Sequence, residues 1–169
     1  MHNNLSKYWI DALNLKPHPE GGHYREIFSS DDRISKNCLP EKYGNERKFY
    51  TSIYFLLEGN EISHFHRIKS DEIWNFHCGS ALEIHVINSE GKHIIKKLGL
   101  NTGKNEFPQQ IVEAGCWFGA CLENKEGFAL VGCFVSPGFE FDDFELANRN
   151  KLINDFPLHK KIIEKLSLH

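Results

Sequence analysis

The stretch from Gly59 to Gly79 carries two histidines and a glutamate at a spacing that suits chemistry. His64 and His66 are two residues apart, and side chains two apart on a strand point to the same face. Glu72 follows a polar run that is typical of a turn. If the flanking strands pair as a hairpin, Glu72 falls near the imidazoles. Two histidines and a carboxylate that converge can bind a metal or move a proton.

This spacing resembles the first motif of the cupin superfamily, in which a Gly, a His-x-His, a Glu and a second Gly follow one another. Pro17–Glu26 is similar to the opening signature of a single-domain cupin family that is catalogued as a domain of unknown function. Leu130–Cys133 and Ser136–Phe141 are similar to its closing signature. The resemblance covers nearly the whole chain. It implies an all-β fold, a double-stranded β-helix (RmlC-like jelly-roll barrel), and it leaves the activity open.

Composition and strand pattern agree with that fold. The 169 residues suit one domain spanning residues 1–169, and 40% hydrophobic residues are ample core material. Roughly eight to ten short strands are separated by turn signals. Because their connections are too short for crossover helices, they predict a closed antiparallel architecture. Short helices are expected only at the two ends, over residues 4–14 and beyond Ala147.

The charge and the N-terminus exclude several classes of partner. The net charge is −3, so nothing indicates a nucleic-acid partner. No apolar run approaches the roughly 20 residues of a membrane span, and the N-terminus lacks the apolar core of a signal peptide. We therefore expect a cytoplasmic protein with no membrane partner. The five cysteines contain no C-x-x-C pair, so we expect reduced thiols and no cysteine-type zinc site.

A homodimer is also expected. Small cupins commonly pair, and the chain resembles them. The apolar helical tail around Leu152, Ile162 and Ile163 needs a surface to cover.

The cofactor that the sequence suggests is a divalent metal. The resemblance implies that a complete cupin metal site adds a third His from a second motif. Here that motif aligns best with Glu113–Phe118, and Phe118 stands where the last His would be. His64, His66 and Glu72 remain as ligands, and three protein ligands plus water can hold a catalytic zinc. We expect metal to be absent or weakly held after purification, because Phe118 offers no ligand.

His66 and Glu72 are also the candidate catalytic pair for acid–base chemistry. A carboxylate orients an imidazole and raises its basicity, which suits proton abstraction from carbon. Cupin-fold sugar epimerases, which the chain resembles, use a His base in a pocket lined by aromatics. The candidate substrate-binding residues, any of whose aromatics could instead be core, are Glu20, Tyr24, Arg25, Tyr54, His64, Arg67, Trp74, Phe76, Trp117 and Phe118.

Three functions remain open at this point. The first is an epimerase-like or isomerase-like enzyme with a His base, acting on a small ligand such as a nucleotide sugar or a carbonyl compound. The second is a non-catalytic cupin that binds a small ligand in the barrel. The third is a metal-dependent cupin enzyme. An open cavity and a perturbed pKa of His66 would favour an enzyme over a binding protein.

Overall fold

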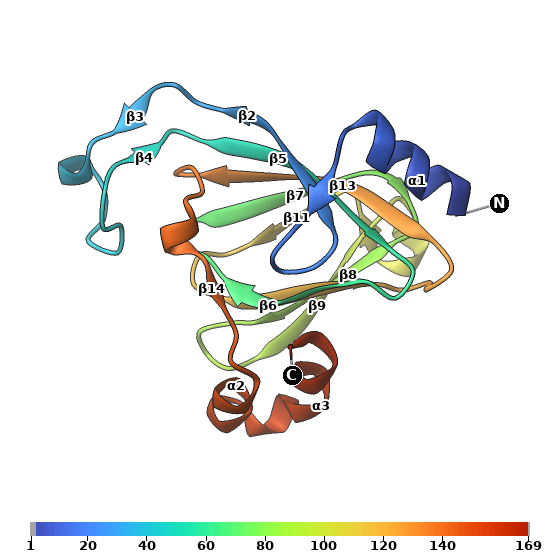
Figure 1. The fold of residues 1–169 in the computed structure, drawn as a ribbon. Helices are drawn as coiled ribbons and strands as arrows, with labels where there is room; N and C mark the ends of the chain where they lie inside the picture. The colour runs from blue at the N-terminus through green and yellow to red at the C-terminus, as the bar shows by residue number, and fades with distance from the viewer. Residues whose placement is uncertain (1–2, 169) are drawn as a thin grey trace.

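The computed structural model describes residues 3–168 and consists mainly of two facing six-stranded sheets (Figure 1). The first sheet contains, in spatial order, β1 (Lys16–Pro17), β2 (His23–Ser29), β5 (Thr51–Glu58), β13 (Phe128–Ser136), β7 (Asp71–Gly79) and β11 (Gln109–Val112). The second contains β10 (Glu106–Phe107), β9 (His93–Leu98), β8 (Leu82–Ile87), β12 (Trp117–Leu122), β6 (Ile62–Arg67) and β14 (Glu145–Leu146). A small ribbon of β3 (Arg33–Ile34) and β4 (Arg47–Lys48) extends from the barrel as an arm.

The helices lie at the two ends of the chain, as predicted. They are α1 (Asn3–Ala12), α2 (Arg149–Asp155) and α3 (Lys160–Leu166). Single 3₁₀ turns are η1 (Lys36–Cys38), η2 (Thr102–Lys104), η3 (Phe141–Asp143) and η4 (Pro157–His159). The predicted all-β jelly-roll fold with short terminal helices is confirmed. No helix among residues 3–168 is long and apolar enough to cross a membrane.

The C-terminal helices cover the outer face of the second sheet (Figure 1). Leu152, Ile163 and Leu166 are at most 1% exposed and pack with Phe65 and Ile87 of that sheet. Burying side chains of this size stabilises the fold by about 1.5–3 kcal/mol each. The apolar tail therefore covers its own barrel, and the argument that it needs a partner chain is wrong. The homodimer stays a prediction without that support.

One ladder departs from the antiparallel expectation. β9 and β10 pair in parallel, with Glu106 opposite Lys97 and Phe107 opposite Leu98. The chain returns through η2, after which Asn105 adopts a left-handed conformation with φ of 59°. Because this ladder has only two residue pairs, no crossover helix is needed to form it. Every other ladder of the described residues is antiparallel.

The two strands of the central motif belong to opposite sheets. β6 pairs with β12 and β14, whereas β7 pairs with β13 and β11. The expected hairpin is therefore wrong, because residues 68–70 cross from one sheet to the other and each strand pairs with strands distant in the sequence. His66 and Glu72 consequently stand on opposite walls of the barrel.

One end of the barrel interior is filled by aromatic side chains. Trp74, Phe55 and Phe118 are each 1% exposed, and the Trp74 ring packs edge-on against the other two, with centroids 5.8 and 6.4 Å away. Offset and edge-to-face packing of this kind is the favoured aromatic geometry. Any ligand cavity must therefore lie at the other end, towards the arm.

Candidate functional site

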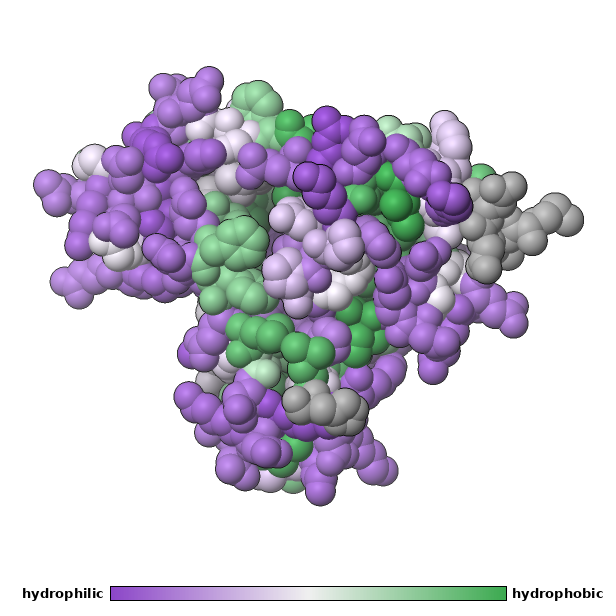
Figure 2. Space-filling view, viewed as in Figure 1, coloured by the Kyte–Doolittle hydropathy of each residue, from purple (hydrophilic) through white to green (hydrophobic). Residues whose placement is uncertain are grey.

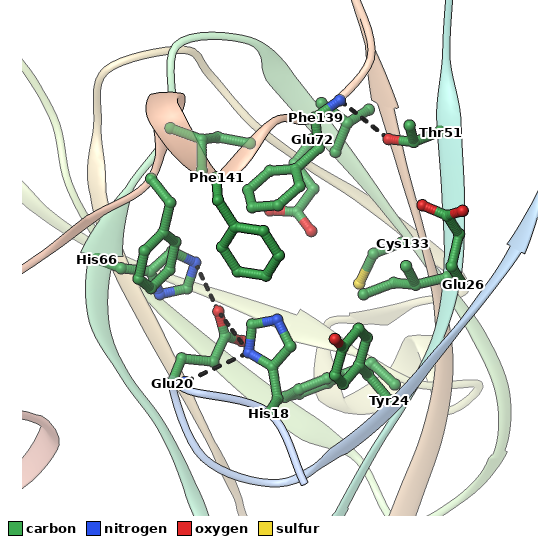
Figure 3. A pocket seen from close by; sticks show the side chains of 15 residues that line it. His18, Glu20, Tyr24, Glu26, Thr51, His66, Glu72, Cys133, Phe139 and Phe141 are labelled. Carbon is green, nitrogen blue, oxygen red and sulfur yellow. Dashed lines mark hydrogen bonds and ion pairs between the residues drawn. The ribbon is translucent and has the colours of Figure 1, made fainter. Parts of the chain in front are cut away.

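A cavity of about 320 Å³ opens at the unfilled end of the barrel (Figure 3). Its apolar walls are formed by Ile53, Phe55, Ile68, Val135, Phe139, Phe141 and Phe144. Its polar groups are those of His18, Glu20, Tyr24, Glu26, Thr51, His66, Glu72 and Cys133. Small-molecule sites have this size, this apolar character and a few placed polar groups. Apolar residues also gather on the outer surface between the arm and the barrel (Figure 2).

A glycine-dependent loop brings Glu20 to the cavity. Gly21 and Gly22 have φ of +107° and +71°, which glycine adopts without the strain that a Cβ causes. A Cβ on Gly21 would lie 2.1 Å from the carbonyl oxygen of Ile62, so only glycine lets the loop press against β6. The carbonyl of Glu20 in turn accepts the His64 N–H at 2.8 Å.

Glu20 is the carboxylate that meets His66. Glu20 Oε2 lies 3.2 Å from His66 Nε2 and 3.5 Å from His18 Nδ1 (Figure 3). The other carboxyl oxygen, Oε1, accepts a hydrogen bond from the Ser63 hydroxyl at 2.8 Å. Both His66 and Glu72 are in the described part of the chain, and no hydrogen bond or ion pair joins them. The expected pairing of His66 with Glu72 is therefore replaced by a pairing with Glu20.

The hydrogen bonds fix the tautomers of the two histidines. His66 Nδ1 lies 2.8 Å from the carbonyl oxygen of His64, which only accepts, so this nitrogen carries a proton. His18 Nδ1 accepts the backbone N–H of Glu20 at 3.3 Å, so the neutral ring carries its proton on Nε2. In the neutral rings, two nitrogen lone pairs then face Glu20 Oε2. The contact between Glu20 and His66 is favourable only if one proton lies between them.

Burial favours the neutral forms of this group. Burial raises the pKa of Glu20, an effect that His18 and Ser63 oppose. Burial lowers the pKa of His66, against the charge of Glu72, and it lowers the pKa of His18, against the charge of Glu20. A protonated Glu20 that donates to His66 Nε2 satisfies these directions and the tautomers together.

Glu72 faces the cavity from the opposite sheet (Figure 3). It is 7% exposed, and burial raises its pKa to about 7; Glu20 would add to the rise when ionised, and His66 would oppose it when protonated. The neighbouring Cys133 thiol stays neutral because burial, followed by the charge of Glu72, raises its pKa well above the usual value. Glu72 is thus a carboxyl group that changes charge near neutral pH inside an apolar cavity.

His18 is a site residue that sequence reasoning missed. Its Nδ1 edge turns to Glu20 while the opposite edge of the ring faces the cavity (Figure 3). The Tyr24 ring packs edge-on against it at 4.4 Å and holds its orientation. His18 lies inside the opening signature, two residues from Glu20, so that signature was the available signal. The other lining residues missed are Glu26, Thr51, Ile53, Phe55, Ile68, Cys133, Val135, Phe139, Phe141 and Phe144.

A β-bulge explains why His64 does not share the face of His66. In the ladder between β12 and β6, Phe118 lies opposite His66, but Ala120 lies opposite Ser63, so β6 has one extra residue. The bulge turns both Ser63 and His66 inward and leaves His64 out of phase. His64 does not line the cavity, and its Nδ1 lies 2.6 Å from the Glu20 carbonyl oxygen.

The barrel residues do not fit the expected metal site. The crossing puts Glu72 on a different sheet from His64 and His66, and the bulge puts the two histidines out of phase. The three side chains are not a converging donor group within the described residues. Phe118 stands where the cupin motif would place a third histidine ligand, and its ring centroid lies 4.1 Å from that of His66.

The remaining aromatic candidates lie away from the cavity. Trp74 and Phe118 belong to the core, and Phe76 lies beyond them, in a shallow hollow on the other side of the barrel end. Tyr54 is on the outer face, where its ring packs edge-on against His77 at 5.6 Å. Trp117 packs with the cluster beneath the C-terminal helices. Trp74 and Phe76 do share one face of β7 with Glu72, but core side chains fill the barrel interior below Glu72.

Both candidate arginines lie outside the cavity lining. Arg25 Nη1 donates to the Leu13 carbonyl at 3.1 Å. Arg67 pairs with Glu145, with Nη2 and Oε2 2.6 Å apart, and its guanidinium lies 4.5 Å above the Trp117 ring. As exposed pairs of this kind contribute about 0–1 kcal/mol, the contact is a modest surface interaction.

Comparison with known proteins agrees with the fold. The family model described as "Cupin superfamily (DUF985)" matches residues 7–147. The chain is 42% identical to a protein of Shewanella oneidensis with a crystal structure, with a TM-score of 0.87 and 96% of each chain covered. A hypothetical protein from Leishmania major is 34% identical over 96% of this chain and 98% of its own, with a TM-score of 0.86.

A more distant likeness concerns the fold alone. Oxalate decarboxylase from Bacillus subtilis is 17% identical and matches with a TM-score of 0.54, over 89% of this chain and 36% of its own. Among curated proteins, none matches. The family match and the two near relatives establish that the chain belongs to the DUF985 family of the cupin superfamily.

Proposed function

We propose that this cupin is an isomerase-type or epimerase-type enzyme that moves a proton on a carbon atom beside a carbonyl group. The observation that carries the proposal is that Glu72, with a pKa of about 7, faces the same cavity as the neutral imidazole of His18. A base whose pKa is near the working pH is the most effective at taking a proton from carbon. A neutral imidazole can donate a hydrogen bond to the oxygen that becomes negative.

In this proposal Glu72 is the base. Its ionised carboxylate takes the proton from carbon, the C–H electron pair moves into the carbonyl system, and His18 Nε2–H stabilises the resulting oxyanion. Glu72 then returns the proton to the neighbouring carbon, as in an isomerase, while the hydroxyl proton of that carbon passes to the other oxygen. In an epimerase with one base, the planar enolate turns over in the cavity and Glu72 returns the proton to the opposite face of the same carbon. The apolar walls strengthen both electrostatic interactions because they exclude water.

His66 has a positioning role here and is not the base expected from the sequence. Its Nδ1 is held by the His64 carbonyl and its Nε2 by Glu20, so neither ring nitrogen is free for a substrate. The chain of contacts from His66 through Glu20 to His18 supports a different task. It keeps the proton of His18 on the nitrogen that faces the cavity.

The charge of the cavity narrows the substrate class. Its lining holds the three carboxyl groups of Glu20, Glu26 and Glu72 and no Lys or Arg. The diphosphate of a nucleotide sugar would meet no cation here, because Arg25 and Arg67 lie elsewhere. An uncharged sugar or a small hydroxy-carbonyl compound fits the lining better, with Glu26 and Tyr24 as partners for hydroxyl groups.

The proposal is tested by proton exchange. The protein is incubated in deuterium oxide with a panel of neutral aldoses, ketoses and small hydroxy ketones, and deuterium at carbon is followed by NMR. Wild type should exchange at least one of them, and Glu72→Gln should lose about 10²–10⁴-fold in rate. Glu106→Gln, an equally buried carboxyl at 7% exposure on β10, should retain the rate. Ligand binding without exchange in wild type would favour the non-catalytic alternative.

A further inference from the structure

A second cluster of reactive side chains lies outside the barrel cavity, on the outer face of the second sheet. Among the described residues, Glu83, His85 and Cys121 form the group of His, Cys or carboxylate side chains whose donor atoms all lie within 4.8 Å of one another. Glu83 and His85 are two apart on β8 and share a face, and Cys121 on β12 is the direct ladder partner of Glu83. The helix α3 covers this region (Figure 1).

We propose that Glu83, His85 and Cys121 bind a zinc ion. His85 Nε2 lies 3.7 Å from Glu83 Oε2 and 3.8 Å from Cys121 Sγ. In a tetrahedral site with ordinary zinc–nitrogen, zinc–oxygen and zinc–sulfur bonds, neighbouring donor atoms are about 3.4–3.6 Å apart. These two pairs need to contract by only a few tenths of an ångström, and the Glu83 and Cys121 donor atoms lie within 4.8 Å of each other. The mixture of thiolate, imidazole and carboxylate suits zinc better than magnesium or calcium, which prefer oxygen alone.

The surroundings of His85 favour the tautomer that a metal requires. His85 Nδ1 lies 3.1 Å from His93 Nε2, and the two rings are nearly parallel, at 8°. When Nδ1–H donates to His93, the lone pair of His85 Nε2 points towards Glu83 and Cys121. Metal-binding histidines characteristically donate their second nitrogen in this way. Burial, and then His93 and Lys165, lower the pKa of His85 to about 4, so the ring is neutral at pH 7.

Two lysines lie beside the donor atoms of the cluster. Lys165 Nζ lies 3.3 Å from Cys121 Sγ, and Lys97 Nζ lies 3.7 Å from Glu83 Oε1 while it also pairs with Glu123 at 2.7 Å. The positive charge of Lys165 beside the Cys121 sulfur repels a metal cation that approaches it. Lys165 is exposed on the last turn of α3, so its side chain can move into solvent when zinc takes its place. Lys165 should therefore lower the affinity for zinc without blocking the site.

The sequence pattern could not reveal this group. A single cysteine on one strand and a Glu-x-His on another lack the short, repeated spacing of a zinc motif. The site also differs from the metal site that the cupin resemblance implies, because its side chains point out of the barrel. Cys121 and His85 belong to the layer between the second sheet and the C-terminal helices.

The test is a titration of the chelator-treated protein with zinc alone, in competition with a chromophoric chelator. We expect one zinc per chain. Cys121→Ser and Glu83→Gln should each lower the affinity at least tenfold, and Lys165→Met should raise it. Cys116→Ser, which removes another buried thiol, and His66→Asn, which alters the barrel cavity, should leave it unchanged. Circular dichroism checks that every variant is folded.

Cobalt provides a second readout that does not depend on affinity. Wild type loaded with cobalt should show thiolate-to-cobalt charge-transfer absorption, and Cys121→Ser should lack it while Cys116→Ser keeps it. The proposal is overturned if no zinc binds, if Cys121→Ser binds zinc as tightly as wild type does, or if His66→Asn rather than Cys121→Ser loses the metal.

Discussion

The barrel cavity and the cluster on the outer face of the second sheet use similar side chains in different arrangements. In the cavity, His66 and Glu72 stand on opposite sheets and leave space between them. On the outer face, Glu83, His85 and Cys121 are neighbours within one sheet, and their donor atoms converge. Groups separated across a cavity can act on a ligand that enters, whereas groups that converge within a sheet can hold an ion. The same residue types therefore support different chemistry according to which strands pair.

The largest expected difference between the two regions is the effect of a His18 substitution on the exchange rate. His18→Leu removes the proposed oxyanion donor, so the exchange rate should fall by about 10²–10³-fold, which corresponds to about 3–4 kcal/mol. The wild-type rate should rise with pH through about 7, because ionised Glu72 is the active form. Measured exchange rates between pH 5 and pH 9 check both points. A His18→Leu variant with wild-type rates would remove His18 from the mechanism, and zinc binding at the outer cluster should be unaffected in either case.

The next effect is on stability. A carboxyl group whose pKa is about 7 when folded and 4.5 when unfolded binds its proton more tightly in the folded state. The contribution of Glu72 to wild-type stability should therefore fall as pH rises from 4.5 through 7. Glu72→Gln lacks this loss and should exceed wild type by an amount that grows to about 3 kcal/mol at pH 8. Urea unfolding at pH 5 and pH 8 measures it, and an equal difference at both pH values would contradict the assignment.

The outer cluster should gain stability from zinc. At a free zinc concentration of 100 times Kd, wild type should gain about 2.7 kcal/mol of stability. Cys121→Ser should gain far less, because it loses the thiolate ligand. Thermal unfolding with and without zinc measures the gain. If Glu72→Gln abolished the zinc effect and Cys121→Ser did not, the two regions would have been assigned to the wrong chemistry.

The smallest predicted effect is that of a glycine substitution that should disturb the cavity and leave the outer cluster unchanged. Gly21→Ala should cost about 1–3 kcal/mol, because the backbone has φ of +107° and the new Cβ meets the Ile62 carbonyl. The loop should move off β6, weaken the contact of Glu20 with His66, and leave zinc binding intact. Gly44→Ala is the matched control, since no described atom lies within 4 Å of a Cβ there. Equal stabilities of the two variants would show that the loop does not depend on Gly21.

Much of the fold could be predicted from local patterns. The terminal helices, the alternation of most strands and the two glycines follow from periodicity and backbone conformation, and the jelly roll follows from the motifs. The pairing of β6 with β12 rather than with β7 could not, because it depends on contacts between residues distant in the sequence. The parallel ladder of β9 and β10 likewise arises from a local turn that strand counting does not detect.

The site was predictable only in part for the same reasons. Of the residues predicted for the site, Glu20, Tyr24, His66 and Glu72 line the cavity. The partner of His66 could not be identified, because the crossing between the sheets separates it from Glu72. Strict alternation also failed at His64, since one extra residue in β6 shifts the phase. A bulge depends on the neighbouring strand, here on the close approach of Gly119 to the Ser63 carbonyl.

The central claim, that Glu72 titrates near neutral pH inside the cavity, has a direct test that needs no substrate. Protein labelled with ¹³C at the glutamate side-chain carboxyl carbons is titrated by NMR, and Glu72→Gln identifies the resonance. We predict that one resonance, absent from Glu72→Gln, changes shift with a midpoint near pH 7. A Glu72 resonance that titrates entirely below about pH 5, as an ordinary glutamate does, would contradict the account.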